Sequence, residues 1–269
     1  MATTVKSASR GRTRRANDRR GRSRIGGFRT IEFERDDSIA RITLDRPEVL
    51  NAYNSEMRDD FYAALSMVRD DVSIRAVVLR GNGKAFSSGG DIREFGSAPS
   101  PVAAREIRLA RDVWKLLVSL DAWTIAAIHG HAAGSGLEMA LLCDFRIAAA
   151  GSLLLLPETG LGMVPGVVGT QTVPRIVREG HALDILLTGR RIDARLAERL
   201  GMVGSVVPGD RLRREADRLA GRLANIEGKL SAAAKRLVMR GLDLPLDAAL
   251  AVERATARRF PAERRGNEP

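Results

Sequence analysis

The sequence predicts an α/β fold in which strands and helices alternate along about the first 210 residues. Short apolar runs of strand length are separated by glycine turns and by segments with helical periodicity, an order typical of βα units. Beyond residue 210 the strand patterns end and three helical segments follow. With 269 residues, 44% of them hydrophobic, the chain can bury a large core.

The first 24 residues form a basic segment without a hydrophobic pattern. Nine lysines and arginines minus one acidic residue give it +8 of the net charge of +11, which leaves +3 for the other 245 residues. We expect residues 1–28 to be a disordered tail, because a segment with so few apolar side chains cannot bury enough surface to fold. The tail is either an inert extension or a non-specific contact for anions or nucleic acid. Since the body is not basic, nucleic acid is not predicted to be the main partner.

Strand and helix patterns then follow one another to residue 149. The runs Thr30–Glu34 and Ile39–Leu44 flank a polar turn and predict a β-hairpin, and Ser55 is a suitable helix N-cap. The elements predicted after the hairpin are a helix at 55–70, a strand at 76–79, a helix at 102–120, a strand at 124–128, a short helix from about residue 137 and a strand at 145–149.

The C-terminal part is predicted to be helical, with segments at 211–226, 231–241 and 246–260. Their apolar faces indicate packing on the core or on another subunit. No uninterrupted apolar run reaches the roughly 18 residues of a membrane helix, so we expect a soluble protein. The single cysteine, Cys143, excludes an internal disulfide and fits a reducing, cytoplasmic compartment.

Two glycine-bearing loops carry the residues that could do chemistry. The first, at 84–92, contains Gly89 and Gly90, and paired glycines let a backbone come close to a ligand. The second, at 129–138, joins a strand to a helix start, where unpaired N–H groups suit a developing oxyanion. Glu138 lies in the first turn of that helix, and Glu158 follows twenty residues later.

Each of these signals also has a purely structural explanation. Glycine loops close many α/β turns, Glu138 could serve the helix dipole, and Glu158 could be a solvated loop residue. A Rossmann site is not indicated, because Met139 stands where the third small residue is needed. Cys143 follows two leucines and is predicted to be a core residue rather than a nucleophile. A metal site is not predicted, because the sequence has one cysteine and no acidic cluster near these loops.

The combination of motifs, in this order and spacing, resembles the crotonase (enoyl-CoA hydratase/isomerase) superfamily over about residues 30–260. The matching segments are Arg46–Ala52, Ala85–Ile92, Ile125–Asp144, Pro157-Glu158, Gly162–Gly166 and Gly169–Gln171. The resemblance implies a spiral core of ββα units at 29–210 and a C-terminal helical trimerisation region at 211–269. It also implies a homotrimer or homohexamer that acts on an acyl-CoA thioester, with no metal and no cofactor beyond the coenzyme A of the substrate.

The resemblance also assigns roles to residues. The two oxyanion donors are the backbone N–H groups of Gly90 and Ser135, and the two catalytic acids are Glu138 and Glu158. Glu158 handles the proton at the alpha carbon, while Glu138 holds and activates water, which gives syn addition of water to a 2-enoyl-CoA. The residues expected to contact the substrate and its coenzyme A are Ser88, Gly90, Asp91, Ile92 and Arg93.

Three departures from the family pattern leave the acyl group and the exact reaction open. Ala122-Trp123 stands for the usual Lys-Pro, Leu154-Leu155 for Phe-Gly, and Thr172 for an arginine. The presence of both glutamates favours a hydratase over an isomerase, a hydrolase or a ring-modifying enzyme on the same frame. Fatty-acid and specialised metabolism both remain open. Alternatives of another class are nucleic-acid binding through the tail with a vestigial core, and a pseudoenzyme.

Overall fold

A computed structural model of the chain describes residues 15–17, 23–96, 100, 102 and 111–260. The strands are β1 (Arg15–Asn17), β2 (Ser23–Ile25), β3 (Ile31–Asp36), β4 (Ile39–Leu44), β5 (Ala76–Gly81), β6 (Trp123–Ile128), β7 (His131–Ala133), β8 (Phe145–Ala149), β9 (Leu153–Leu155), β10 (Ile192–Asp193) and β11 (Ser205–Val207). The α-helices are α1 (Ser55–Asp70), α3 (Val113–Ser119), α4 (Ser135–Leu142), α5 (Gly169–Ile176), α6 (Glu179–Thr188), α7 (Ala194–Arg199), α8 (Leu212–Ala224), α9 (Gly228–Gly241) and α10 (Leu246–Ala257). The 3-10 helices are η1 (Pro47–Val49), η2 (Ile92–Glu94), η3 (Thr159–Leu161) and η4 (Gly209–Arg211).

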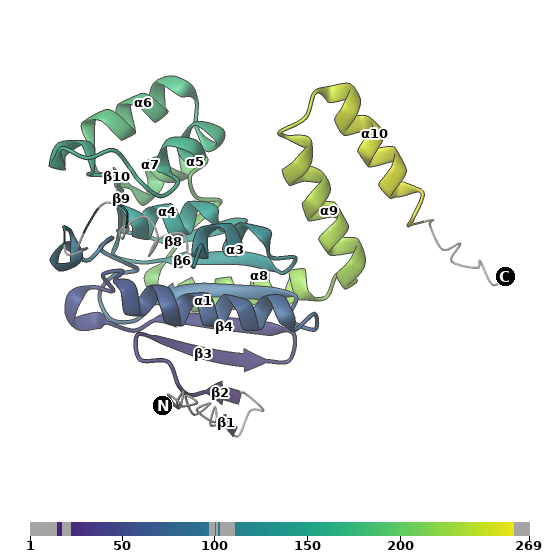
Figure 1. Cartoon of the computed structure of the whole chain (residues 1–269), viewed down its shortest axis with the longest axis horizontal. Coiled ribbons are helices and arrows are strands. Elements are labelled where there is room, and N and C mark those ends of the chain that lie inside the picture. The colour runs from purple at the N-terminus through teal and green to yellow at the C-terminus, as the bar shows by residue number, and fades with distance from the viewer. Residues whose placement is uncertain (1–14, 18–22, 97–99, 101, 103–110, 261–269) are drawn as a thin grey trace, which may run out of the picture.

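A central sheet organises the molecule (Figure 1). Its strand order is β1-β2-β3-β4-β5-β6-β8-β11, antiparallel as far as β4 and parallel from β4 onward. A second sheet has the order β10-β9-β7. In it β7, which follows β6 in the chain, pairs in parallel with β9, which follows β8, and β10 pairs with β9 in antiparallel orientation. Because parallel strands need crossovers, the helices between them cover the sheet and produce the predicted α/β spiral of ββα units.

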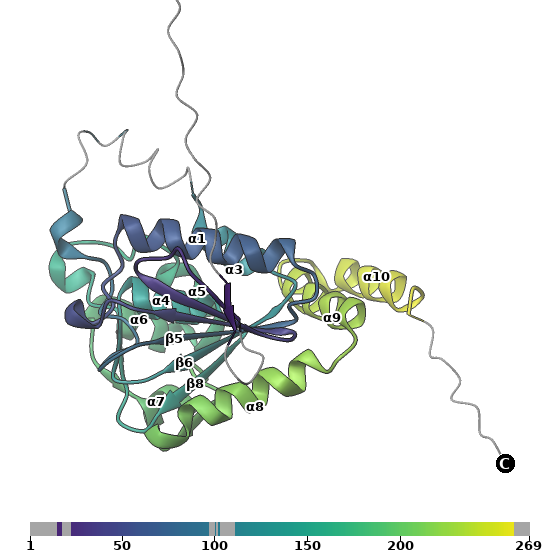
Figure 2. The same ribbon diagram turned by 90° about the horizontal axis from the view of Figure 1, so that it is seen from below.

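Helices cover both faces of the central sheet, as Figure 2 shows, with α1 and α3 on one side and α8 on the other. Alternate side chains of β5 and β6 divide between two apolar cores. Val77 and Leu79 face the large core beneath α1 and α3, while Val78 and Ile125 face the small core beneath α8. The α8 side chains in that small core are mostly alanines, which lets the helix lie close to the strands.

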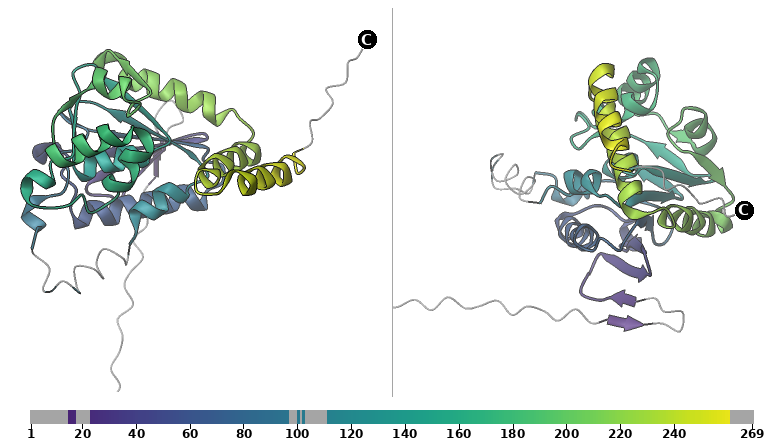
Figure 3. Two further views of the ribbon diagram at one scale, coloured as in Figure 1. Left: turned by 90° about the horizontal axis from the view of Figure 1, so that it is seen from above. Right: turned by 90° about the vertical axis from the view of Figure 1, so that its right-hand side faces the viewer.

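The last two helices, α9 and α10, leave the body as a projecting arm (Figures 1 and 3). They pack on each other, and α10 has no buried residue. Within the described part of 211–269, α8 packs on the central sheet, and the projecting arm begins with α9.

Most predicted elements are confirmed, including the hairpin of β3 and β4 and the three C-terminal helices. Asn54, not Ser55, is the N-cap of α1, since its side chain accepts a hydrogen bond from the N–H of Met57. Of the helix expected at 102–120, the C-terminal part is confirmed as α3. Residues 103–110 lie outside the described residues. Of the tail expected to be disordered, 15–17 and 23–25 are short strands, and 1–14 and 18–22 lie outside the described residues.

Candidate active site

The two glycine-bearing loops lie side by side. A bridge pairs Ser87 with Ala132, and the N–H of Ala133 donates to the carbonyl of Ser87 over 3.0 Å. The approach is so close that a Cβ on Gly136 would lie 2.6 Å from the Cβ of Ser87. Only a glycine fits there, so the loop after β5 and the turn before α4 form one structure although about 45 residues separate them in sequence.

This structure presents the two predicted oxyanion donors. The N–H groups of Gly90 and Ser135 have no hydrogen-bond partner among the described residues. A Cβ placed on Gly90 would lie 3.7 Å from Oγ of Ser135, so the structure brings the two residues together. Ser135 is the first residue of α4, where the helix dipole adds partial positive charge. Two unpaired N–H groups on neighbouring residues, one of them at a helix start, form a suitable site for a negatively charged oxygen.

Glu138 lies in the first turn of α4 with its side chain inside the protein. Only 1% of its surface is exposed, and its Oε1 accepts hydrogen bonds from the N–H groups of Val168 at 2.8 Å and Gly169 at 2.7 Å. These two donors form the N-terminus of α5. The carboxylate is therefore held in one orientation by charge-assisted hydrogen bonds.

Glu158 follows β9, and its side chain lies beside the turn that precedes α4. Its Oε1 lies 2.9 Å from the position that a Cβ on Gly134 would occupy, and Gly134 is the residue before Ser135. Its Oε2 is buried without a hydrogen-bond partner. Burial raises the pKa of Glu158 above its ordinary value, and the nearby charge of Glu138 raises this pKa further.

The environments of the two acids differ in a way that suits acid/base chemistry. Two backbone N–H groups donate to the Glu138 carboxylate, whereas burial and a neighbouring negative charge raise the pKa of Glu158, whose Oε2 has no hydrogen-bond partner. Such a pair can accept a proton at one carboxylate and deliver one from the other, beside a site for an oxyanion.

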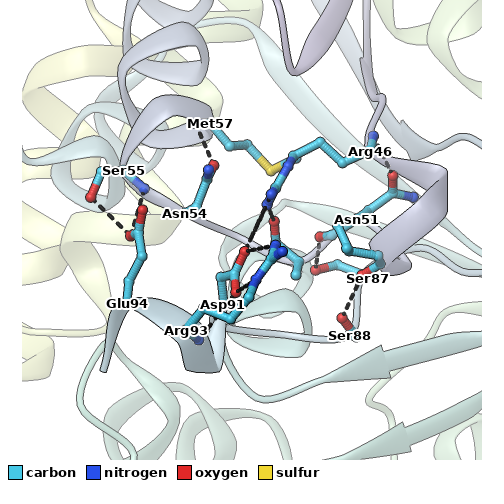
Figure 4. A network of polar contacts seen from close by, with 12 residues as sticks. Arg46, Asn51, Asn54, Ser55, Met57, Ser87, Ser88, Asp91, Arg93 and Glu94 are labelled. Carbon is cyan, nitrogen blue, oxygen red and sulfur yellow. Dashed lines mark hydrogen bonds and ion pairs between the residues drawn. The ribbon is translucent and has the colours of Figure 1, made fainter. Parts of the chain in front are cut away.

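The loop at 88–93 is fixed by a buried ion pair, which Figure 4 shows. Asp91 is buried and accepts hydrogen bonds from the guanidinium groups of Arg46 and Arg93. Arg93 holds the pKa of Asp91 well below its usual range, and Arg46 adds to this. Ser88, Ile92 and Arg93 are exposed, so their side chains are accessible to a ligand, whereas the Asp91 carboxylate holds the loop.

Sequence reasoning gave no role to several residues that build this site. The buried Asn51 joins the loops, because its side chain donates to the carbonyls of Asn82 and Ala85 at 2.8 Å each. The N–H donors of Val168 and Gly169 were also missed. Asn51 and Gly169 lie in segments matched to the family, and that membership was the only signal that could have found them.

The residues that depart from the family pattern make structural contacts. Trp123 begins β6, packs on Phe145 and donates to Ser231 of α9. Leu155 ends β9, and its carbonyl accepts the N–H of Gly134 at 3.0 Å. Thr172 lies in the α5 helix, and its hydroxyl donates to the carbonyl of Val168.

The described residues offer no metal site and no reactive thiol. Those residues contain no group of three His, Cys, Asp or Glu side chains that could hold a metal ion. None of their helices has the length and apolar character needed to cross a membrane. Cys143 is buried, as predicted, and burial raises the pKa of its thiol to about 12, so it is a core residue and a poor nucleophile.

An α/β spiral with two unpaired N–H groups beside a pair of unlike carboxylates is an arrangement suited to acid/base chemistry on a substrate that develops an oxyanion. Comparison with known proteins identifies the family. The sequence profile of the enoyl-CoA hydratase/isomerase family matches residues 34–268, and the chain belongs to this family, which is the crotonase superfamily expected from its motifs.

Relatives with assigned names agree with this membership. The chain is 37% identical to a probable enoyl-CoA hydratase of Mycobacterium tuberculosis over 227 residues, 84% of this chain and 88% of the relative. It is 35% identical to the crotonyl-CoA hydratase of Syntrophomonas wolfei over 229 residues, 84% and 87% of the two chains. A Thermobifida fusca protein solved in complex with acetoacetyl-CoA superposes with a TM-score of 0.81 and 30% identity, over 87% of this chain and 95% of the other.

Proposed function

We propose that this protein is an enoyl-CoA hydratase that adds water reversibly, in syn geometry, to a 2-enoyl-CoA thioester. The observation that carries the proposal is the placement of Glu138 and Glu158 beside the free N–H groups of Gly90 and Ser135. Both the crotonyl-CoA hydratase of Syntrophomonas wolfei and the short-chain-enoyl-CoA hydratase of Clostridium acetobutylicum support it as relatives.

The proposed reaction uses each group once. Glu138 accepts a proton from water as the oxygen bonds to the beta carbon, and the electron pair of the double bond moves to the thioester oxygen. The N–H groups of Gly90 and Ser135 stabilise the resulting enolate, a contribution of roughly 3 to 4 kcal/mol for a typical donor. Glu158 then delivers its proton to the alpha carbon. Transfer of the proton held by Glu138 to Glu158 returns both acids to their starting states. The residues need no metal or redox cofactor for these steps.

The test is hydration of crotonyl-CoA and of longer and aromatic enoyl-CoAs, followed by loss of the conjugated thioester absorbance. Glu138→Gln and Glu158→Gln should each lower kcat by about 10²–10⁴-fold, because each removes one acid/base group while its shape is kept. Release of free thiol would identify a hydrolase, and double-bond migration without hydration an isomerase. Binding of acyl-CoA without any turnover of the panel would contradict the hydratase proposal.

The surroundings of the reaction are part of the same proposal. Ser88, Ile92 and Arg93 offer exposed side chains, and Gly90 and Asp91 backbone groups, for contact with coenzyme A. The exposed apolar residues of α9 and α10 support a homotrimer or homohexamer. The single, buried cysteine Cys143 supports a cytoplasmic location. An enoyl-CoA substrate would make the protein an enzyme of lipid metabolism.

A further inference from the structure

The Ser135 side chain has a feature that the proposed reaction does not use. Among the described residues, four buried side-chain atoms have no hydrogen-bond partner, namely Tyr53 Oη, Ser135 Oγ, Glu158 Oε2 and Arg190 Nε. Two of the four, those of Ser135 and Glu158, belong to the candidate active site. Because buried hydroxyl groups are nearly always hydrogen-bonded in folded proteins, the isolated Ser135 hydroxyl requires an explanation.

Helix capping does not explain this hydroxyl. The N-cap of α4 is Gly134, which has no side chain, and Ser135 is already the first helical residue. An N-cap side chain accepts a hydrogen bond from the free N–H groups of the first helical turn, and a side chain at the first helical position does not have this role. The hydroxyl therefore neither caps the helix nor bonds to a neighbouring side chain.

The position of the hydroxyl relative to the two backbone donors is informative. Oγ belongs to the residue whose N–H is one donor, and it lies 3.7 Å from the point where a Cβ on Gly90, the residue of the other donor, would lie. The ring of Phe95 lies 3.1 Å from that same point. The hydroxyl thus lies beside the residues of both backbone donors, and its proton is free to rotate toward an oxygen bound between them.

We propose that the Ser135 hydroxyl is a third hydrogen-bond donor to the thioester oxygen, in addition to the N–H groups of Gly90 and Ser135. This inference rests on the proposed function. As charge develops on the thioester oxygen, a hydrogen bond from a neutral hydroxyl to that oxygen becomes charge-assisted and shortens, so it stabilises the enolate more than the ground state. Ser135 is then a catalytic residue through its side chain as well as through its backbone.

The proposal is tested with Ser135→Ala and Ser135→Gly, which remove the hydroxyl and keep the backbone N–H. Both should lower kcat for enoyl-CoA hydration on the order of tenfold to a hundredfold, less than the about 10²–10³-fold of a principal oxyanion donor because two donors remain. KM should change little. Ser152→Ala is the matched control, since it deletes another buried hydroxyl, one that donates to the carbonyl of Ile128 outside the site.

A second measurement does not depend on turnover. Acetoacetyl-CoA forms an enolate with its own ultraviolet band, and titration of this band in the presence of enzyme reports how strongly the site favours the enolate. Ser135→Ala and Ser135→Gly should both bind the enolate about tenfold more weakly than wild type does, and Ser152→Ala should not. If no enoyl-CoA is hydrated by wild type but this enolate difference persists, the hydratase proposal fails and the third donor stands.

Two outcomes would overturn the third donor. The first is a result in which both Ser135 variants keep the kcat and the enolate affinity of wild type. A loss in Ser135→Ala that Ser135→Gly does not share would count in the same way, because it would assign the effect to the Cβ. The second is unchanged enolate affinity with a displaced limb of the pH–rate profile, which would make the hydroxyl a partner of the unpaired Glu158 oxygen.

Discussion

Glu138 and Glu158 are chemically alike, and the fold makes them different. The Glu138 carboxylate accepts two backbone hydrogen bonds, whereas Glu158 has an oxygen without a partner and lies close enough to Glu138 to experience its charge. An unsatisfied buried oxygen lowers stability, and its retention at a reactive site is typical of a group that acquires its partner with the substrate.

At neutral pH, Glu158→Gln should stabilise the protein, by roughly 1 kcal/mol. Folding raises the pKa of Glu158, so ionising this group is less favourable in the folded than in the unfolded chain. The cost is absent below the ordinary pKa of 4.5, where both states are protonated, and it grows as the pH rises through the folded pKa. Urea unfolding at a series of pH values measures the difference, which should disappear on acidification.

Glu138→Gln is the control for this stability effect. Its carboxylate accepts two charge-assisted hydrogen bonds, so the neutral amide should bring no gain at neutral pH. A pH-independent gain in Glu158→Gln, or an equal gain in both variants, would contradict the assigned cause.

At the scale of elements, the site depends on how close two loops can come. Gly134 has a φ of +49°, in the left-handed region, and leaves room for the Glu158 carboxylate. Gly151, with a φ of +88°, is equally left-handed but has no atom within 4 Å of a Cβ position.

This pair of glycines separates backbone strain from contact with the active site. Gly134→Ala and Gly151→Ala should each lower the free energy of unfolding by about 1 kcal/mol, because alanine disfavours a positive φ. Only Gly134→Ala should also lower kcat, by at least about tenfold, since its methyl group displaces Glu158. Unfolding and hydration assays on both variants check this, and equal activity in the two would contradict the contact.

The arm is joined to the body by a buried ion pair. The Lys235 side chain is 6% exposed and donates to Asp144 at 2.7 Å and to the carbonyl of Ala122 at 2.9 Å. The next residue, Arg236, pairs with Asp121 on the surface with 53% of its side chain exposed. Adjacent residues of α9 thus make a buried and an exposed ion pair.

Lys235→Met should therefore destabilise the protein by about 3 kcal/mol, because it leaves the Asp144 carboxylate buried without its cation. Arg236→Gln should cost less than about 1 kcal/mol, as is usual for exposed pairs. Chemical denaturation of both variants gives the comparison. Equal losses would mean that the arm is not held by the buried pair.

The sequence predicted the strands β3, β4, β5, β6 and β8, the C-terminal helices and both glycine-bearing loops, because hydrophobic runs and glycines are local signals. It did not predict the short strands β1, β2, β7, β9, β10 and β11 or the helices α5 to α7. Val168 and Gly169 were not predicted to hold Glu138, since they lie about 30 residues away in a segment without periodicity. The ion pair of Lys235 with Asp144 was missed for the same reason, because 91 residues separate its partners. The identities of the two glutamates came from family motifs, while the difference between their environments required the fold.

At the scale of the whole molecule, α9 and α10 project from the body (Figure 3). Several of their apolar side chains are exposed in the described chain. Leu242 and Leu246 are 78% and 75% exposed. Apolar patches of this kind are usual at subunit interfaces. The arm therefore fits the homotrimer or homohexamer proposed above.

Light scattering should give a mass of three or six times the 29.2 kDa chain for the wild-type protein. Leu242→Glu combined with Leu246→Glu should shift the protein toward monomer, because charged side chains oppose burial in an interface. Val72→Glu is the control, since Val72 is exposed on the body and not on the arm. A monomeric wild type, or dissociation by Val72→Glu alone, would contradict the role of the arm.

The division of labour between the two glutamates is tested most directly by proton exchange at the alpha carbon. Butyryl-CoA has an alpha proton but no beta hydroxyl to lose, so its exchange in D₂O, followed by NMR, reports alpha-carbon chemistry alone. We expect exchange with wild type, retained exchange but hydration of crotonyl-CoA lowered by about 10²–10⁴-fold with Glu138→Gln, and a loss of both activities with Glu158→Gln. Exchange that survives in Glu158→Gln and disappears in Glu138→Gln would reverse the two roles and contradict the proposed mechanism.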